Sequence, residues 1–261
     1  MNIDSIIFLV SDVKLNYFFN KYNQEIKNVA QVGAHFGQEI EIFNKHNINQ
    51  IFLFEPNQNA IEVLKNKIKN LPKIKVFPFA LGNENSLIKM YHSSGNEGQS
   101  SSLLEPKLHK KVQPEIEFKE KVTIDVKRFE DLKINHIDFL IMDVQGFELE
   151  VLKGFGKKLN QVQFIFTEVN RDELYKDNVL VKELDYFLKN KGFIRTWTSW
   201  RTADMPWGDA FYLRTSRLGK FKEYYILIKN FLTTNKIFFF LYLILDFRLI
   251  KKRIKKLTRA I

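Results

Sequence analysis

The 261-residue sequence contains no cysteine, which excludes a disulfide framework, a thiolate zinc site and a cysteine nucleophile. Long apolar runs are also missing: the longest, Ile237–Leu245, has nine residues, against the ~20 that a membrane-spanning helix needs. A third absence is the G-x-G-x-x-G pattern of dinucleotide-binding folds, which argues against a nicotinamide enzyme. With a hydrophobic content of 45%, these absences predict a globular protein of a reducing compartment.

The positive charge of the chain is concentrated at one end. The net charge is +11, and residues 217–261 hold twelve lysines and arginines but only two acidic residues. This tail therefore carries +10 and the first 216 residues only +1. A nucleic-acid-binding domain would show a basic face on its body, so we do not expect nucleic acid as a partner.

The order of apolar runs and helical patterns predicts the fold class. Five continuous apolar runs are expected to form buried strands, at Asn28–Val32, Gln50–Phe54, Lys75–Ala80, Ile137–Met142 and Gln163–Val169. Helices are expected between or after them, at Gly37–His46, Asn59–Ile68, Glu148–Leu152 and Val179–Lys189. Two later segments, Phe193–Trp197 and Ala210–Leu213, are expected to close an antiparallel edge. This alternation predicts an α/β fold with a doubly wound, mainly parallel sheet.

Three regions are expected along the chain. Residues 1–27 are predicted to be a helical segment, residues 28–216 the α/β domain, and residues 217–261 a basic amphipathic tail. No secretory signal is expected, because Asp4 and Asp12 flank the apolar residues 6–10 and no basic segment precedes them. Within the domain, the pattern is lost between Tyr91 and Glu120, which we expect to form a lid, an inserted hairpin or a partly disordered segment.

A glycine-containing turn follows the first predicted strand. The residues Val32–Gly37 read V-G-A-H-F-G, and a helix is expected to begin directly after them. Glycine lets the backbone turn tightly and approach a ligand, and a helix N-terminus favours anionic groups. The spacing is equally compatible with a purely structural turn.

A carboxylate ends the second predicted strand. Glu55 lies 22 positions after Gly33, where an acidic side chain in a βαβ unit can accept hydrogen bonds from both hydroxyls of a ribose. Pro56 follows it and stops the strand. Together with the glycine turn, Glu55 favours a nucleoside-containing ligand over an exposed loop carboxylate.

Two further carboxylates end the fourth and fifth predicted strands. Asp143 and Glu168 are expected at the carboxyl edge of the sheet, where open α/β sheets bind their ligands. Asp143 could orient a hydroxyl, take its proton or hold a divalent cation, and Glu168 could form a pair with it. Hydrogen bonding to loop amides is the structural alternative for both.

Six motifs in order carry a resemblance to a known family. They read V-G-A-H-F-G, F-E-P-N, F-A-L-G-N, D-V-Q-G-F-E-L-E-V-L-K-G, F-T-E-V-N and G-D-A-F-Y-L, between Asn28 and Leu213. In this combination the chain resembles the FkbM family of methyltransferases. The resemblance implies a Rossmann-like class I methyltransferase core that binds S-adenosylmethionine and methylates a hydroxyl of a sugar, a glycan or a small-molecule scaffold.

The resemblance also implies a site. Residues implied at the methionine end of the cofactor are Gln31, Gly33, Ala34, His35 and Gly37. Glu55 and Pro56 would lie at the ribose, Ala80 and Leu81 at the adenine, and Asp143 at the reacting centre. The candidates for proton transfer are Asp143, Glu168 and His35, and the need for a divalent metal is left open.

Four positions depart from the family pattern. Gln31 replaces the usual Asp, His35 the usual Asn, Met142 the usual Lys, and Gln145 the common Glu. Gln31 can hydrogen-bond an ammonium group but offers no charge, which predicts weaker cofactor binding. The alternative function is therefore an interaction module, cofactor-dead or tethered to the membrane, with a Rossmann-like fold.

The tail predicts a location. The apolar run 237–245 is followed by five basic residues within 251–256, as in a helix that lies in the interface of an anionic membrane. We expect a cytoplasmic protein held peripherally at the inner membrane face through residues 237–261. A packed helix pair or a dimer contact is the alternative for this segment.

Overall fold

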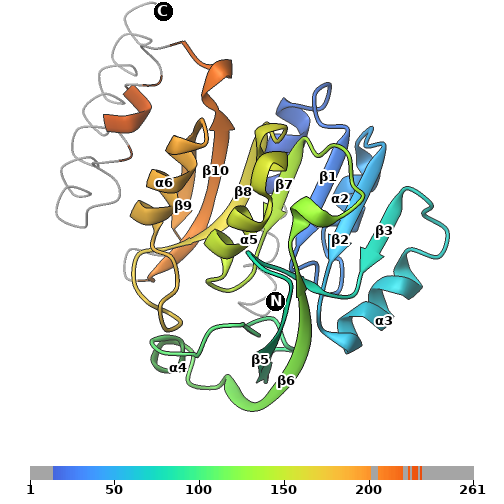
Figure 1. Cartoon of the computed structure of the whole chain (residues 1–261), viewed down its shortest axis with the longest axis vertical. Coiled ribbons are helices and arrows are strands. Elements are labelled where there is room, and N and C mark those ends of the chain that lie inside the picture. The colour runs from blue at the N-terminus through green and yellow to red at the C-terminus, as the bar shows by residue number, and fades with distance from the viewer. Residues whose placement is uncertain (1–13, 201–204, 220–222, 224, 229, 231–261) are drawn as a thin grey trace, which may run out of the picture.

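A computed structural model describes residues 14–200, 205–219, 223, 225–228 and 230. Its centre is a seven-stranded sheet with the order β3-β2-β1-β7-β8-β10-β9 (Figure 1). The strands are β1 (Asn28–Val32), β2 (Gln50–Phe54), β3 (Ile74–Phe77), β7 (Phe139–Met142), β8 (Phe164–Asn170), β9 (Phe193–Trp200) and β10 (Trp207–Arg214). Only β10 is antiparallel to its neighbours. The doubly wound, mainly parallel sheet expected from the sequence is confirmed.

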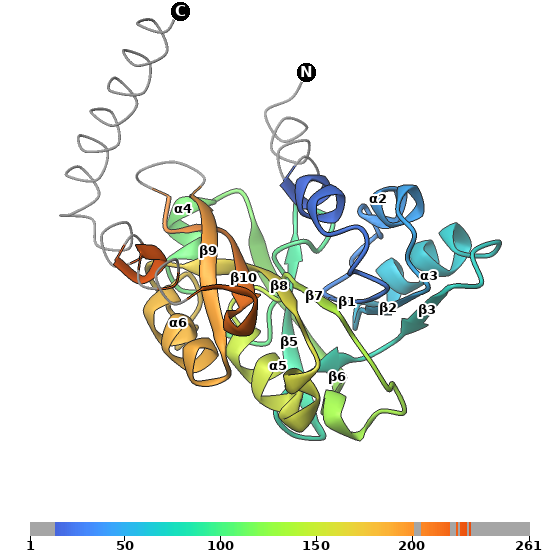
Figure 2. The same ribbon diagram turned by 90° about the horizontal axis from the view of Figure 1, so that it is seen from above.

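Helices cover both faces of this sheet (Figure 2). Helical residues 14–21, α2 (Ile40–Lys45) and α3 (Gln58–Lys67) lie on one face. The other face carries α5 (Glu148–Gly154), η2 (Gly156–Asn160) and α6 (Val181–Asn190). Each central strand is therefore buried on both sides, which explains why its sequence is a continuous apolar run.

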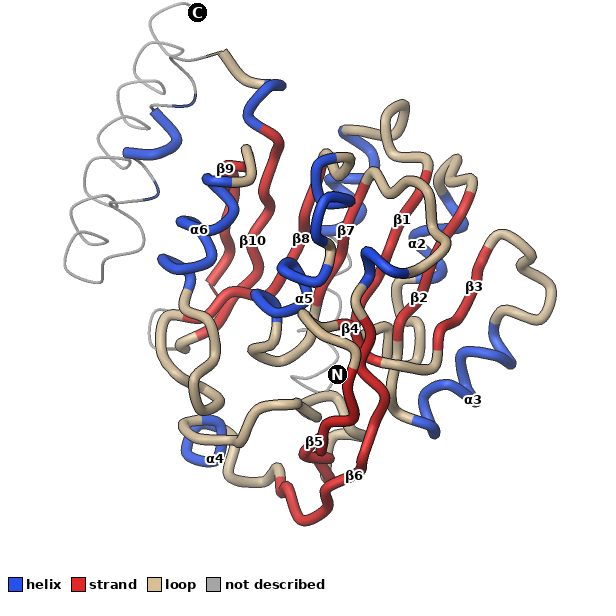
Figure 3. The backbone as a smooth tube through the Cα atoms, in the orientation of Figure 1, coloured by secondary structure: helices blue, strands red, loops and turns tan. Residues whose placement is uncertain are grey.

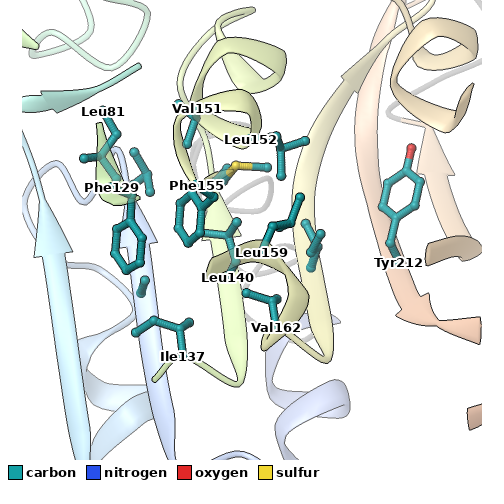
Figure 4. Close-up of a cluster of buried hydrophobic side chains, with 14 of the residues drawn as sticks. Leu81, Phe129, Ile137, Leu140, Val151, Leu152, Phe155, Leu159, Val162 and Tyr212 are labelled. Atoms are coloured by element: carbon teal, nitrogen blue, oxygen red, sulfur yellow. The ribbon is translucent and has the colours of Figure 1, made fainter. Parts of the chain in front are cut away.

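Alternate residues of each strand feed two separate cores. Ala30 and Val32 of β1 belong to the cluster shared with α5 and α6, whereas Val29 belongs to the cluster shared with residues 14–21, α2 and α3. Figure 4 shows the first cluster, in which Val151 and Leu152 of α5, and Phe155 directly after it, lie over Leu140 of β7. Burial of these side chains fixes the position of the strand ends that carry the site.

A second, three-stranded sheet lies beyond the carboxyl edge of the main sheet (Figure 3). Its order is β4-β6-β5, from β4 (Ala80–Leu81), β5 (Ser86–Ser94) and β6 (Glu117–Lys127). The irregular residues 95–116 between β5 and β6 contain the short α4 (His109–Val112). Of the three forms expected for Tyr91–Glu120, the inserted hairpin is the one observed, and the register of β5 with β6 runs from Ser86↔Val126 to Ser94↔Glu117.

The prediction for the third strand was wrong about where the strand ends. The run Lys75–Ala80 was expected to be one strand, but β3 ends at Phe77 and Ala80 begins β4 in the other sheet. Pro78 lies between them and has no N–H to donate to a ladder, so the chain leaves the main sheet there. Ala80 and Leu81 consequently move toward the site.

The chain ends only partly belong to the described structure. Residues 215–217 form η3 (Thr215–Arg217), and the expected membrane-interface segment 237–261 lies outside the described residues, as do residues 1–13. In the described part of the chain, no helix has the length and apolar character required to cross a bilayer. The three expected regions stay a prediction.

Candidate active site

A pocket opens at the point where the strand order reverses, between β1 and β7, and its space amounts to about 920 Å³ when the part open to solvent is included. Ligands of open α/β sheets bind at such a switch point. The walls come from the carboxyl ends of β1, β2 and β7, from β4, and from the segment that follows β5. The lining residues discussed below are Gly33, His35, Gln38, Glu39, Phe54, Glu55, Asn57, Ala80, Leu81, Met90, Gly98, Gln99, Ser101, Ser102, Leu103, Asp143, Gln145 and Phe147.

The turn after β1 brings two chain segments into direct contact. Gly33 has φ +80°, and its amide donates to Phe54 O at 3.0 Å. A Cβ atom at Gly33 would lie 1.9 Å from the carbonyl oxygen of Asp143. The turn therefore requires glycine for two independent reasons, a left-handed backbone and the close approach of the loop after β7.

Glu55 is a buried carboxylate held by backbone amides. It is 6% exposed, Oε2 accepts from His35 N at 2.8 Å, and Oε1 accepts from Asn57 N at 2.7 Å. Burial raises the pKa of Glu55 to about 7, against the two amide hydrogen bonds, which lower it. Each carboxylate oxygen retains a lone pair for a further donor from the pocket.

His35 closes the pocket rather than offering a free nitrogen to it. Its Nε2 lies 2.9 Å from Glu97 O, a pure acceptor, so Nε2 carries the hydrogen. Its Nδ1 then accepts from Gln38 Nε2 at 3.1 Å, and burial lowers the pKa of the imidazole. With both ring nitrogens bound, the arrangement favours a structural role for His35 over the proton transfer considered from the sequence.

Residues 97–103, called the roof below, cover the pocket from the side of the small sheet. Gly98, Gln99, Ser101, Ser102 and Leu103 of the roof line the pocket. Three hydrogen bonds hold it from outside: His35 Nε2 to Glu97 O, Ser102 Oγ to Gln145 O at 2.7 Å, and Tyr175 Oη to Ser100 O at 2.9 Å. The roof separates the pocket from solvent on this side.

Asp143 begins the loop that follows β7. Gln145 Nε2 donates to Asp143 Oδ1 at 2.6 Å, and Asp143 lines the pocket, as Glu55 does. Glu168 lies two residues before the end of the neighbouring β8, is 9% exposed and is not part of the lining. The structure therefore places Asp143, but not Glu168, at the wall of the pocket.

The other residues predicted for the site also divide into those that line the pocket and those that do not. Gly33, His35, Glu55, Pro56, Ala80, Leu81 and Asp143 line the pocket, whereas Gln31, Ala34, Gly37 and Glu168 lie behind it. Gln31 acts through a neighbour: its Nε2 donates to Oε2 of Glu39, which does line the pocket, at 2.8 Å. Residue roles at these positions stay predictions.

Several lining residues escaped the sequence analysis. Glu39, Met90 and the roof residues come from segments that carry no motif of their own, and Phe147 lies within the motif that begins at Asp143 but was given no role there. The irregular composition of Tyr91–Glu120 was the one available signal for the roof. It marked an insertion without indicating that the insertion folds back over the first turn.

A second buried carboxylate, Glu148, lies beneath the loop of Asp143. It is fully buried, and Oε1 accepts from Gly146 N at 3.2 Å and Val144 N at 3.4 Å. Its Oε2 has no hydrogen-bond partner among the described residues. Burial raises the pKa of Glu148 to about 7. Glu148 thus holds the loop through these two hydrogen bonds, although its carboxylate loses its hydration on burial.

We expect Glu148→Gln to remove part of the pH dependence of folding. The pKa of Glu148 is 4.5 when unfolded and about 7 when folded, so its proton is bound more tightly in the folded state between these values. The wild type should therefore lose about 3 kcal/mol as pH rises from 4.5 through 7. About 2 kcal/mol of this loss falls between pH 5.5 and 8.5, where urea unfolding measures it. The variant should lose less, and Glu150→Gln on the same helix should behave like the wild type.

Metal ligands do not gather in this site. Within the described residues, no three histidine, aspartate or glutamate side chains are placed so that they could hold a metal ion. The divalent cation that the sequence left open at Asp143 therefore has no further ligands among them.

The part of the chain that forms the pocket has counterparts among known proteins. Residues 31–195 match the family described as Methyltransferase FkbM domain, which is more than half of the chain. The chain belongs to the FkbM methyltransferase family. The resemblance noted from the six motifs is confirmed, and the family region includes every lining residue of the pocket.

Two relatives illustrate the range of this family. The chain is 28% identical to the 2-O-methyltransferase NoeI of Sinorhizobium fredii (strain NBRC 101917 / NGR234) over 145 residues, 52% of this chain and 59% of that protein. The crystal structure of the methyltransferase FkbM from Methylobacillus flagellatus KT superposes with a TM-score of 0.50 at 15% identity, over 72% of this chain and 44% of that one. The chain thus spans less than two thirds of each relative, and the solved structure supports the FkbM fold alone.

Proposed function

We propose that this member of the FkbM family is an S-adenosylmethionine-dependent O-methyltransferase. The observation that carries the proposal is Glu55, a buried carboxylate at the end of β2 whose remaining acceptor sites face a pocket of about 920 Å³. The complete pocket favours this enzyme over the interaction module that Gln31 left open. A hydroxyl of a sugar, a glycan or another small molecule is the proposed acceptor, and the name of NoeI supports transfer to oxygen.

The residues present fit S-adenosylmethionine. Glu55 can accept two ribose hydroxyls in addition to the amides of His35 and Asn57. Apolar side chains suited to a flat adenine line the pocket on the side of the small sheet, namely Ala80, Leu81, Met90, Leu103 and Phe147. The absence of a side chain at Gly33 lets the loop after β7 pack directly against the turn, so that both border the pocket.

Glu39 compensates for the missing charge of Gln31. The amide of Gln31 holds the Glu39 carboxylate at the pocket wall, with an N–O distance of 2.8 Å. A carboxylate near the methionine end would attract the ammonium group of the cofactor. The departure from the family pattern at position 31 is thus accompanied by an acidic side chain eight residues later.

The bound cofactor would supply an activated methyl group, so the protein must position the acceptor, exclude water and accept a proton. The roof covers one side of the pocket, and Asp143 lines the pocket after β7, where it would orient the acceptor hydroxyl. The methyl group would come from the sulfonium S–C bond of the cofactor, which would leave as the neutral thioether, while the carboxylate of Asp143 would accept the proton of the acceptor hydroxyl. Asp143 itself is exposed, and its hydrogen bond from Gln145 Nε2 orients it.

We expect Asp143→Asn to separate binding from turnover. The variant keeps the shape of the side chain but cannot take a proton, so transfer of radiolabelled methyl groups to a panel of sugars should fall by about 10²–10⁴. Calorimetric titration should show an affinity for S-adenosylhomocysteine within a few-fold of the wild type. Asp172→Asn is the matched control and should remain active. Full turnover by Asp143→Asn would refute the proposed role.

We further propose that the tail binds anionic membrane. Five basic residues within 251–256 would contribute ~1 kcal/mol each near an anionic surface. The full chain should sediment with phosphatidylserine vesicles at low salt, and a chain ending at Arg214 should not. Neutral vesicles are the control. Equal binding of both chains would favour the helix pair or the dimer contact instead.

A further inference from the structure

A short chain of hydrogen bonds leads from Asp143 to a buried tyrosine outside the predicted site. Gln145 Nε2 donates to Asp143 Oδ1 at 2.6 Å, and the other end of the same amide, Oε1, lies 2.9 Å from Tyr175 Oη. The tyrosine hydroxyl also lies 2.9 Å from Ser100 O in the roof. The amide of Gln145 therefore lies between the carboxylate and the tyrosine, and the tyrosine connects both to the roof.

The backbone of Gln145 is fixed in an uncommon conformation. Its φ is +53°, a left-handed value that costs a non-glycine residue about 1–2 kcal/mol. Ser102 Oγ holds Gln145 O at 2.7 Å, and Gly146 N donates to Glu148 Oε1 at 3.2 Å. Strained conformations of this kind persist where the surroundings determine them, and they are frequent at active sites.

The hydroxyl group of Tyr175 keeps its proton in this position. The residue is fully buried, and burial, followed by the nearby charges of Glu168, Asp143 and Glu148, raises its pKa well above 10. It therefore has one hydrogen for two acceptors at equal distance, Gln145 Oε1 and Ser100 O. The choice between them depends on the orientation of the Gln145 amide.

We infer that Gln145 and Tyr175 are positioning residues that hold Asp143 in place and allow it to accept a proton. The inference rests on the proposed function, in which Asp143 takes the proton of the acceptor hydroxyl. Tyr175 does not line the pocket, whereas Gln145 lines it next to Asp143. In this inference both act through their hydrogen bonds, Gln145 on Asp143 and Tyr175 on Gln145.

The network can serve both states of Asp143 without losing a hydrogen bond. With Asp143 ionised, the amide nitrogen of Gln145 faces the carboxylate and the tyrosine donates to Gln145 Oε1. With Asp143 protonated, the amide turns over: Asp143 donates to Gln145 Oε1, Gln145 Nε2 donates to the tyrosine oxygen, and the tyrosine hydrogen moves to Ser100 O. The two acceptors around the tyrosine hydroxyl match these two states.

The test follows the side-chain amide of Gln145 by NMR in protein labelled with ¹⁵N-glutamine. Gln145→Met identifies the signal, with Gln161→Met as its control. In the wild type the amide signal should move with a single titration as the pH is lowered. Asp143→Asn should abolish that movement, and Tyr175→Phe should shift the signal toward that of exposed glutamines. Tyr186→Phe, a change at an exposed tyrosine, should leave it in place.

Turnover provides a second readout. Tyr175→Phe should lower kcat roughly tenfold, less than the complete loss of a general base, while the KM for S-adenosylmethionine and the affinity for S-adenosylhomocysteine stay within twofold. An amide titration that survives Asp143→Asn, or a signal unaffected by Tyr175→Phe, would overturn the inference. The titration of Asp143→Asn tests the inference even if the Tyr175→Phe variant does not fold. Full turnover by Asp143→Asn would instead refute the proposed role of Asp143, whatever the amide signal does, whereas no binding of S-adenosylhomocysteine by the folded wild type would refute the proposed function.

Discussion

Gly33→Ala is expected to lose binding of S-adenosylhomocysteine and much of its stability. The new methyl group would lie 1.9 Å from Asp143 O, far inside van der Waals contact, and φ at this position is +80°. The left-handed backbone costs alanine about 1–2 kcal/mol, and overpacking adds about 1–3 kcal/mol. We expect the free energy of unfolding to fall by about 2–5 kcal/mol, a drop in Tm of roughly 4–20 °C.

The loss of binding follows from the position of the clash. Relief of the overlap requires the turn after β1 to move away from the loop after β7, and both line the pocket. Thermal unfolding by circular dichroism and calorimetric titration measure the two effects. Gly219→Ala is the matched control, since nothing lies within 4 Å of the added carbon there. A Gly33→Ala protein with wild-type Tm and affinity would show that the turn is not in contact with the ligand.

The affinity for S-adenosylhomocysteine is expected to rise with pH between 6 and 8. Because burial raises the pKa of Glu55 to about 7 in the free protein, much of the protein at pH 6 carries a neutral carboxyl. Ribose hydroxyls donate preferentially to the ionised carboxylate. If only the ionised form binds, the affinity is about tenfold lower at pH 6 than at pH 8, and binding at pH 6 releases a proton.

Glu55 variants separate the charge from the hydrogen bonds. Glu55→Ala removes both acceptor oxygens and should weaken binding by roughly 10²–10³-fold, from about 3–4 kcal/mol of charge-assisted hydrogen bonds. Glu55→Gln should abolish the pH dependence. Titration in buffers of different ionisation enthalpy counts the released protons directly, and Glu62→Gln, an exposed glutamate of α3, serves as control. Unchanged affinity across pH 6–8 would contradict the proposed contact.

Local sequence determined most of the main sheet. The run Gln50–Phe54 is a strand with the predicted bounds, and β8 is displaced by one residue from its prediction, because strands buried on both faces must be continuously apolar. The carboxyl ends of parallel strands share one edge, so Glu55 and Asp143 could be placed near each other without coordinates. Pro78 was the local signal that was overlooked, and it moved Ala80 and Leu81 into the small sheet.

Only the tertiary structure decided what surrounds these two carboxylates. The roof covers the pocket only because distant residues meet. His35 contacts Glu97, 62 positions away, and Tyr175 contacts Gln145, 30 positions away. No periodicity or motif encodes such pairs, since their geometry depends on how a long insertion folds back over the sheet. The same holds for the raised pKa of Glu55 and Glu148: sequence supplies the carboxylate, whereas its charge at neutral pH is set by the desolvation that packing imposes.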